Sequence, residues 1–296
     1  MGIGGGGDVV GAIGVAELAR ARGAEAVVGG MTWERRVVDP LPGPRRLGEL
    51  TGIEPLNAAT ALAGPAARGP GGFRFAEAGV AGVRGEPTLL VDPGGGPAAV
   101  ATGLAGAADA LGCDAVVLLD VGGDALAHGH EPGLASPLCD AVMLAAGARL
   151  AAERPVLGAV FGVGCDGELT VAEVLERLAA VAAAGGGRGA WGLTPEAAAA
   201  VQAGVDAVPT EASAQALACA RGALGPATIR RGRTTVQRSP VGALTFFFDI
   251  PAAVAATARL AAAVDGAGSL EDANDRLHAL GVRSELDFER EHAPPG

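Results

Sequence analysis

Short apolar, β-branched runs alternate with longer Ala-rich runs along most of this chain, and this alternation limits the folds open to it. The apolar runs predict strands at residues 25–29, 88–92, 114–120, 155–162 and 243–249. The Ala-rich runs predict helices at residues 9–22, 97–111, 137–152, 170–184, 211–221 and 251–264. The strands are apolar throughout, which is typical of sheets covered on both faces. We therefore predict an α/β protein with a Rossmann-like, doubly wound, mostly parallel sheet and helices on both faces.

No segment clearly separates two domains, because the Gly- and Pro-rich patches are all too short to be linkers. We expect a single domain over residues 1–296. Residues 51–86 are rich in Gly, Pro and Ala and are expected to form a β-hairpin excursion or a flap over the site. Ser269 predicts the N-cap of a short helix that ends near Gly281. Residues 290–296 are expected to be a disordered tail.

The composition excludes several classes of function. The chain has 296 residues and a net charge of −11, and its 22 basic residues are all Arg, which disfavours nucleic-acid binding. Without Lys it can form neither a Schiff base nor a Walker-type phosphate site. The 4 cysteines are widely spaced, which argues against a zinc ribbon or a disulfide scaffold. Neither a membrane span nor a secretory signal is evident, so we expect a cytoplasmic protein.

A run of four glycines lies near the start of the chain, where Gly4, Gly5, Gly6 and Gly7 precede Asp8 and a predicted helix. Backbone N–H groups in such a turn, with the positive end of the helix, can bind a phosphate or a carboxylate. The alternative is a structural tight turn in which Asp8 caps the helix. No acid follows the next predicted strand, which disfavours a dinucleotide.

The strand that normally precedes a Gly-rich turn of this kind is nearly absent from the sequence. We expect the native protein to begin further upstream and to carry an extra N-terminal strand.

The densest group of polar residues follows the predicted strand 114–120. Asp120 and Asp124 flank two glycines at the end of this strand, where open α/β sheets place their ligands. With Glu131 they are candidate ligands of a divalent cation such as Mg²⁺ or Mn²⁺. The candidate substrate-binding residues of the same segment are Gly122, Gly123 and Ser136. The alternative is structural, with the acids in turns and Ser136 as a helix cap.

A second acidic turn follows the next predicted strand and carries Asp166 and Glu168. Two such turns at neighbouring strand ends would direct their carboxylates into one crevice, where these can share a cation or divide into acid and base. We therefore take Asp166, Glu168 and Asp124 as candidate catalytic residues. The alternative is a surface turn with solvated acids.

Further anion-binding capacity has to come from arginine, which can hold a phosphate or carboxylate through two hydrogen bonds. His128 and His130 are weaker candidates for the site, because their spacing on a loop defines no metal geometry. The candidate arginines are Arg35, Arg36, Arg45, Arg46, Arg230, Arg231 and Arg233.

Several segments together resemble one known family, catalogued as domain of unknown function 1152. They are GIGGGGDVVGA, DVGGDALAHGHEPGLASPLCDA, GCDGELT, PTEASAQAL, SPVGALTFFFD and SELDFE. The resemblance covers residues 1–289 and implies one intact, enzyme-like α/β domain. Members occur mainly in archaea and actinobacteria, which agrees with the Gly- and Ala-rich composition. The family has no established reaction, and its members carry a strand before the Gly-rich turn.

These observations favour an enzyme that acts on a small anionic metabolite, such as a phosphorylated sugar, a nucleotide or a carboxylate, with help from Mg²⁺ or Mn²⁺. Transferase, lyase and hydrolase chemistry all remain open. One alternative is a non-catalytic nucleotide- or metabolite-binding regulator. Another is a subunit of an assembly, and the sequence is compatible with a homo-oligomer. We expect neither nucleic acid nor a membrane as a partner.

Overall fold

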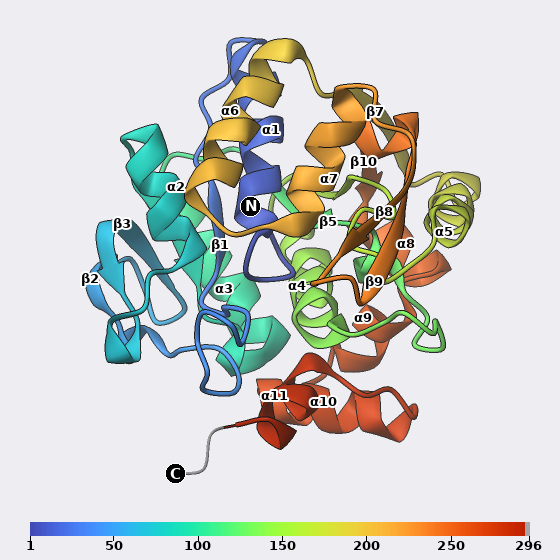
Figure 1. Cartoon of the computed structure of the whole chain (residues 1–296). Coiled ribbons are helices and arrows are strands. Elements are labelled where there is room, and N and C mark those ends of the chain that lie inside the picture. The colour runs from blue at the N-terminus through green and yellow to red at the C-terminus, as the bar shows by residue number, and fades with distance from the viewer. Residues whose placement is uncertain (294–296) are drawn as a thin grey trace.

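The computed structural model describes residues 1–293, and it contains helices and strands in mixed order (Figure 1). The strands are β1 (Gly29–Met31), β2 (Thr51–Pro55), β3 (Thr60–Arg68), β4 (Thr88–Val91), β5 (Val116–Val121), β6 (Val156–Phe161), β7 (Gly187–Gly192), β8 (Gly225–Ile229), β9 (Thr234–Arg238) and β10 (Leu244–Asp249). The α-helices are α1 (Asp8–Arg20), α2 (Ala76–Arg84), α3 (Gly96–Ala110), α4 (Pro137–Leu150), α5 (Val171–Ala183), α6 (Pro195–Ala207), α7 (Glu211–Ala220), α8 (Ile250–Ala256), α9 (Arg259–Val264), α10 (Leu270–Ala279) and α11 (Glu285–Glu291).

Most strands belong to two four-stranded sheets, in the orders β1-β4-β3-β2 and β5-β6-β10-β7. Strand pairs β1–β4 and β5–β6 are parallel, whereas β2–β3, β3–β4, β6–β10 and β7–β10 are antiparallel. Strands β8 and β9 form a separate antiparallel hairpin. The α/β class is confirmed, but among the described residues the sheets are mixed and not mostly parallel as predicted. The reason is that β3 and β10 both run back against their neighbours.

Residues 1–3 join the two sheets. The N–H of Gly2 donates to the carbonyl of Gly29 at 2.8 Å, and the N–H of Ile3 donates to the carbonyl of Leu119 at 3.0 Å. Leu119 donates in return to the carbonyl of Met1, and Gly2 and Leu119 form a parallel bridge. The first residues therefore lie between β1 and β5, in the middle of the molecule (Figure 1). The place of a strand before the Gly-rich turn is filled by these three residues.

Alternate residues of β5 pack into different cores. Leu118 belongs to a cluster with residues of α3, α4, α5 and α9. Leu119 and Val121 belong to a cluster that includes Ala216 of α7. Helices α1, α2 and α6 pack together in a further cluster. Helices therefore cover both faces around β5, which explains why this strand is apolar at nearly every position.

Several boundaries differ from the predictions. The strand expected at residues 25–29 lies at Gly29–Met31. The helix expected at residues 251–264 is divided into α8 and α9, because Thr257 leaves the helical conformation with φ −153°. Residues 51–68 form the β2–β3 hairpin at the sheet edge.

The C-terminal part of the chain packs as helices. Ser269 caps α10 by accepting a hydrogen bond from Asp272 N–H, as predicted. Helix α11 extends to Glu291, so residues 290 and 291 of the expected tail are helical. Residues 294–296 of that tail lie outside the described part of the chain. Helices α2 and α6 and the β8–β9 hairpin were not predicted at all.

None of the helices among residues 1–293 combines the length and the apolar character that a membrane crossing needs. Cys139, Cys165 and Cys219 are buried, whereas Cys113 is partly exposed.

Helix α1 lies so close to β5 that a Cβ at Gly11 would come within 2.5 Å of Val121 Cγ2 and 3.0 Å of Phe161 Cδ1. We expect Gly11→Val to lower the free energy of unfolding by about 2 kcal/mol through overpacking, measured by urea denaturation. The matched control is Gly106→Val on the exposed face of α3, which should change stability by less than about 0.5 kcal/mol. Equal stability of the two variants would contradict this packing.

Candidate functional site

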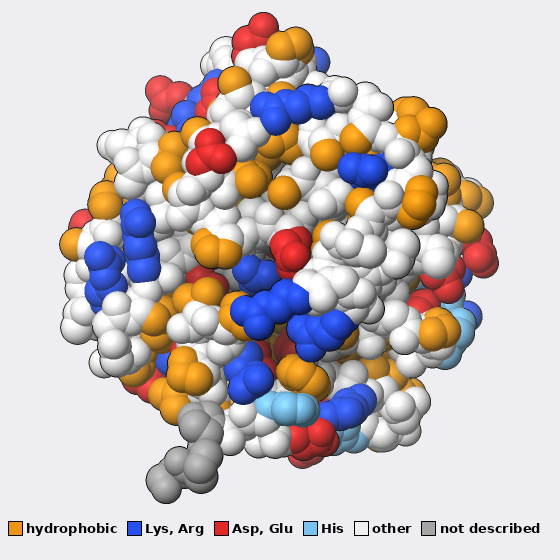
Figure 2. Space-filling view, in the orientation of Figure 1, with side chains coloured by type: hydrophobic (Ala, Val, Ile, Leu, Met, Phe, Trp, Pro, Cys, Tyr) orange, Lys and Arg blue, Asp and Glu red, His pale blue; other side chains and the backbone are white. Residues whose placement is uncertain are grey.

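A pocket of about 160 Å³ lies where the Gly-rich turn faces the carboxyl ends of β5 and β6 and the start of α4. Its lining combines carboxylates with the side chains of Arg35 and Arg230. Figure 2 shows arginines gathered over the middle of this face, with acidic side chains lying deeper. The acidic residues that line the pocket are Asp8, Glu34, Asp120, Asp124, Asp140, Asp166, Glu168, Glu211, Glu285 and Glu289.

The Gly-rich turn from Gly4 to Gly7 lines one side of the pocket. Position 7 has room only for glycine, because a Cβ there would lie 2.3 Å from Thr210 Oγ1. The N-cap of α1 is Gly7 and not Asp8. The carboxylate of Asp8 instead turns back and accepts a hydrogen bond from Gly4 N–H at 3.0 Å. Among the described residues, the N–H groups of Gly5 and Gly7 have no hydrogen-bond partner, so they remain available to a ligand.

The first acidic turn begins at Asp120, the fifth residue of β5. One oxygen of Asp120 accepts a hydrogen bond from Ala125 N–H at 3.1 Å, and its carboxyl group contacts that of Asp124. Gly122, with φ 133°, leaves room for the second acidic turn, since a Cβ there would lie 2.1 Å from Asp166 Cγ. Gly122 and Gly123 shape this turn without lining the pocket, whereas Ser136 lines it.

The two acids of the second turn have different surroundings. Glu168 accepts hydrogen bonds from Ala135 N–H at 2.7 Å, from Ser136 N–H at 2.9 Å and from Ser136 Oγ at 2.7 Å. Its other partner is the guanidinium of Arg230, also at 2.7 Å. Asp166 is only 6 % exposed, and neither of its oxygens has a hydrogen-bond partner within residues 1–293. Of the two acids in this turn, Asp166 is therefore the one whose oxygens lack a protein partner among the described residues.

Burial and mutual repulsion raise the pKa values of five aspartates that line the pocket. Burial raises the pKa of Asp120 to about 6. For Asp8, Asp124, Asp140 and Asp166 burial is again the largest cause, and neighbouring carboxylates raise the pKa further. A positive charge bound among these groups would favour their ionised forms.

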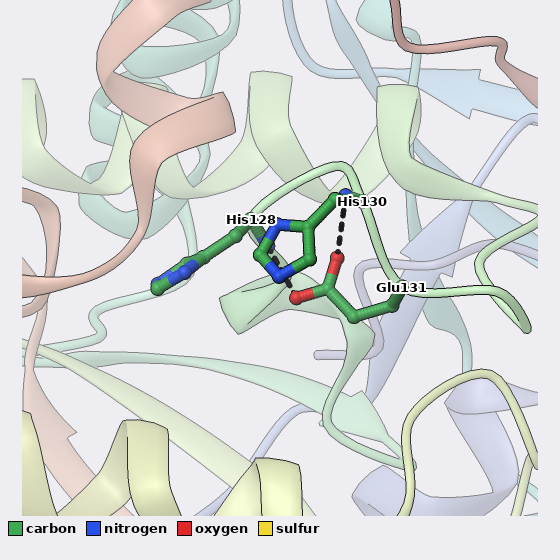
Figure 3. Close-up of side chains that lie close together, drawn as sticks. All are labelled: His128, His130 and Glu131. Atoms are coloured by element: carbon green, nitrogen blue, oxygen red, sulfur yellow. Dashed lines mark hydrogen bonds between the residues drawn. The ribbon is translucent and has the colours of Figure 1, made fainter.

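Glu131 lies outside this pocket, although it follows Asp124 closely in sequence. Its oxygens accept hydrogen bonds from the N–H groups of His128 and His130 (Figure 3). They also accept one from Gly129 N–H, and Glu131 pairs with Arg177 at 3.3 Å. Burial alone would raise the pKa of Glu131, but these hydrogen bonds lower it. His128 Nε2 is in turn 2.9 Å from Thr257 Oγ1. These contacts give Glu131 the role of holding its loop.

Of the candidate arginines, only Arg35 and Arg230 line the pocket. Arg230 lies at the tip of the β8–β9 hairpin. Its φ of 53° is in the left-handed region, which is uncommon for residues other than glycine. Arg35 donates a hydrogen bond to the carbonyl of Pro209. Arg45 is buried in an ion pair with Asp39 at 2.8 Å, so it supports the loop and does not reach the site.

The pocket acids that were not among the predicted site residues are Glu34, Asp140, Glu211, Glu285 and Glu289, and Thr210 also lines the pocket. Asp140 lies four residues after Ser136, one turn into α4, so helical periodicity after the predicted cap was the signal that could have found it. Glu34 and Glu285 come from distant parts of the chain, and only the tertiary fold brings them to the pocket.

Glu34 offers a test of the electrostatics in this region. Burial raises its pKa from 4.5 to about 7, and hydrogen bonding from Ala76 N–H only partly opposes this. Because the folded-state pKa is the higher one, the neutral form supports folding below pH 4.5, and this stability is lost as the pH rises through about 7. We expect Glu34→Gln to stabilise the protein by up to about 3 kcal/mol at pH 8 and little at pH 4.5. Thermal melts across this range provide the measurement.

The control for that substitution is Glu54→Gln on the exposed strand β2, which should leave the dependence of stability on pH unchanged. If the stability of Glu34→Gln depended on pH in the same way as that of the wild type, the pKa of Glu34 would not be raised in the folded protein.

Three comparisons with known proteins bear on the identity of the chain. A search of curated proteins and a search of solved structures both found no match. The sequence profile of one family, described as "Protein of unknown function (DUF1152)", matches residues 1–293. The match spans the whole described chain and confirms the resemblance seen in its motifs. The chain therefore belongs to the DUF1152 family.

Proposed function

We propose that the protein is an enzyme that acts on a small anionic metabolite in this pocket with the help of a divalent cation. The observation that carries the proposal is Asp166, a buried carboxylate without a hydrogen-bond partner among the described residues, placed beside the Gly-rich turn and Arg230. Leaving a buried charge unpaired costs several kcal/mol of stability, so such groups are usually kept for function.

We also propose that the two sheets and residues 1–3 form one Rossmann-like, doubly wound sheet. In this interpretation residues 1–3 are the central strand, β1 and β4 follow on one side, and β5 and β6 follow on the other. Ligands of such sheets bind at the carboxyl ends of the strands, where the strand order reverses. The pocket lies at this position, which supports a ligand there.

The residues of the pocket divide into three roles. The N–H groups of Gly5 and Gly7 and the guanidinium groups of Arg35 and Arg230 would bind the anion. Asp120 and Asp124 would hold the cation, which orients the substrate and neutralises its charge. Asp166 would act as the general base, because its oxygens have no hydrogen-bond partner among the described residues and burial raises its pKa above the ordinary range of an aspartate.

Two predicted residues have other roles in this proposal. Glu168 positions Ser136 and Arg230 and does not move a proton, because four donors already occupy its oxygens. Glu131 is replaced as a cation ligand by acids inside the pocket. The alternative is a non-catalytic binding protein, which would bind the metabolite without turning it over.

A thermal-shift screen with sugar phosphates, nucleotides and dicarboxylates, each with and without Mg²⁺ or Mn²⁺, tests this proposal. A ligand at 100 times its dissociation constant should stabilise the protein by about 2.7 kcal/mol. Turnover of each stabilising compound is then followed by mass spectrometry. We expect Asp166→Asn to lower turnover at least about 100-fold, because an amide cannot accept the proton.

The control variant is Glu153→Gln, an exposed acid away from the pocket, which should leave turnover and ligand binding unchanged. A screen without any stabilising anion would overturn the proposal. So would an Asp166→Asn variant with full turnover.

A further inference from the structure

Six carboxylates of the pocket form two groups of three. Asp8, Asp120 and Asp140 form the first group, and Asp124, Asp166 and Glu168 form the second. Within each group the carboxylate oxygens lie within 4.8 Å of one another. The first group comes from α1, β5 and α4, and the second from the turns that follow β5 and β6.

The two groups are neighbours, because all six acids line the same pocket and Asp120 and Asp124 belong to the same acidic turn at the end of β5. Gly4 lies beside the first group, where a Cβ would come within 2.8 Å of Asp8 Oδ2 and 3.2 Å of Asp140 Oδ2. The two groups therefore form one continuous cluster of acids next to the Gly-rich turn.

Each group contains a buried oxygen without a protein partner. Asp140 is 1 % exposed, and its Oδ1 has no hydrogen-bond partner within residues 1–293. In the second group, the same holds for both oxygens of Asp166. Both residues line the pocket, so these oxygens are placed to coordinate something held between the acids. Carboxylate oxygens are the ligands that Mg²⁺ and Mn²⁺ prefer.

The charge that these six acids would carry when fully ionised is large enough for two divalent cations. Within the described residues, the ion pair that involves one of these six acids is the pair between Arg230 and Glu168. Six ionised carboxylates and one guanidinium leave a charge of −5. One divalent cation would reduce it to −3 and two would reduce it to −1.

We propose that the pocket binds two divalent cations, one in each group of three carboxylates, and that a phosphoryl group of the substrate bridges them. Among the described residues both oxygens of Asp166 lack a partner, so one can coordinate the cation while the other accepts a proton. Glu168 keeps its hydrogen bonds and contributes to the second site mainly through its charge. This inference rests on the proposed function. A phosphoryl group has enough oxygens to contact two cations and still accept hydrogen bonds from Arg230 or the N–H groups of Gly5 and Gly7. Arg230 is already directed into the pocket by its pairing with Glu168.

The test is a titration of the metal-free full chain with Mn²⁺, followed calorimetrically and by electron paramagnetic resonance. We expect two Mn²⁺ ions per chain. Asp140→Asn in the first group and Asp166→Asn in the second should each weaken one site at least tenfold and leave one ion bound. Asp8→Asn and Asp124→Asn repeat the test if either variant fails to fold, as judged by circular dichroism.

His130→Ala is the control, because His128, His130 and Glu131 form a third group of potential metal ligands outside the pocket. This variant should still bind two ions. A loss of one ion in His130→Ala with none lost in Asp140→Asn would overturn the proposed location.

Inorganic phosphate serves as the probe for the bridging group. We expect phosphate to raise the melting temperature of the wild type only when Mn²⁺ is present, and to have no effect on Asp140→Asn or Asp166→Asn. Equal stabilisation without Mn²⁺ would overturn the bridging role.

The outcome also separates this inference from the proposed function. One bound ion, together with a metabolite that is turned over, would overturn the two-cation site and leave the enzyme proposal intact. Two bound ions without a stabilising metabolite would support the cation site and overturn the enzyme proposal.

Discussion

The main-chain hydrogen bonds of residues 1–3 hold the two four-stranded sheets side by side, and the position of the pocket depends on them. The N–H of Ile3 donates a hydrogen bond to the carbonyl of Leu119 in β5, and the Gly-rich turn starts directly after Ile3, at Gly4. The turn is therefore placed beside the end of β5, where Asp120 points into the pocket. The same pairing places α1 against β5, so close that Gly11 has no room for a side chain. One short segment thus sets both the packing of α1 and the location of the acids.

The acids of this protein can be sorted by what their oxygens contact. Glu131 and Glu168 are buried, but backbone N–H groups and arginines occupy their oxygens, so they stabilise loops. Asp140 and Asp166 are equally buried and, among the described residues, keep oxygens that have no partner. Desolvation makes such oxygens costly in the folded chain. The folded protein therefore gains stability from whatever neutralises them, which links ligand binding to folding.

The sequence predicted the α/β class and the convergence of the two acidic turns, because apolar periodicity and Gly–Asp clusters at strand ends are local signals. The structure brings Asp120, Asp124, Asp166 and Glu168 together in one pocket. Glu131 was misplaced because nearness along the chain does not determine where a side chain points after a turn. Glu34 and Glu285 could not be found, since they are brought in by packing between distant segments. The β8–β9 hairpin that carries Arg230 was missed because its strands lack a clear apolar pattern.

Gly122 has a consequence for how this site can vary among proteins. Because Gly122 has no side chain, Asp166 can occupy the space beside it, and the two acidic turns pack tightly against each other. A replacement at position 122 would displace an acid that belongs to a different turn, and it would do so without altering any polar atom. The arrangement of the pocket acids is therefore constrained by a residue that does not line the pocket, because a replacement of Gly122 would require Asp166 to move.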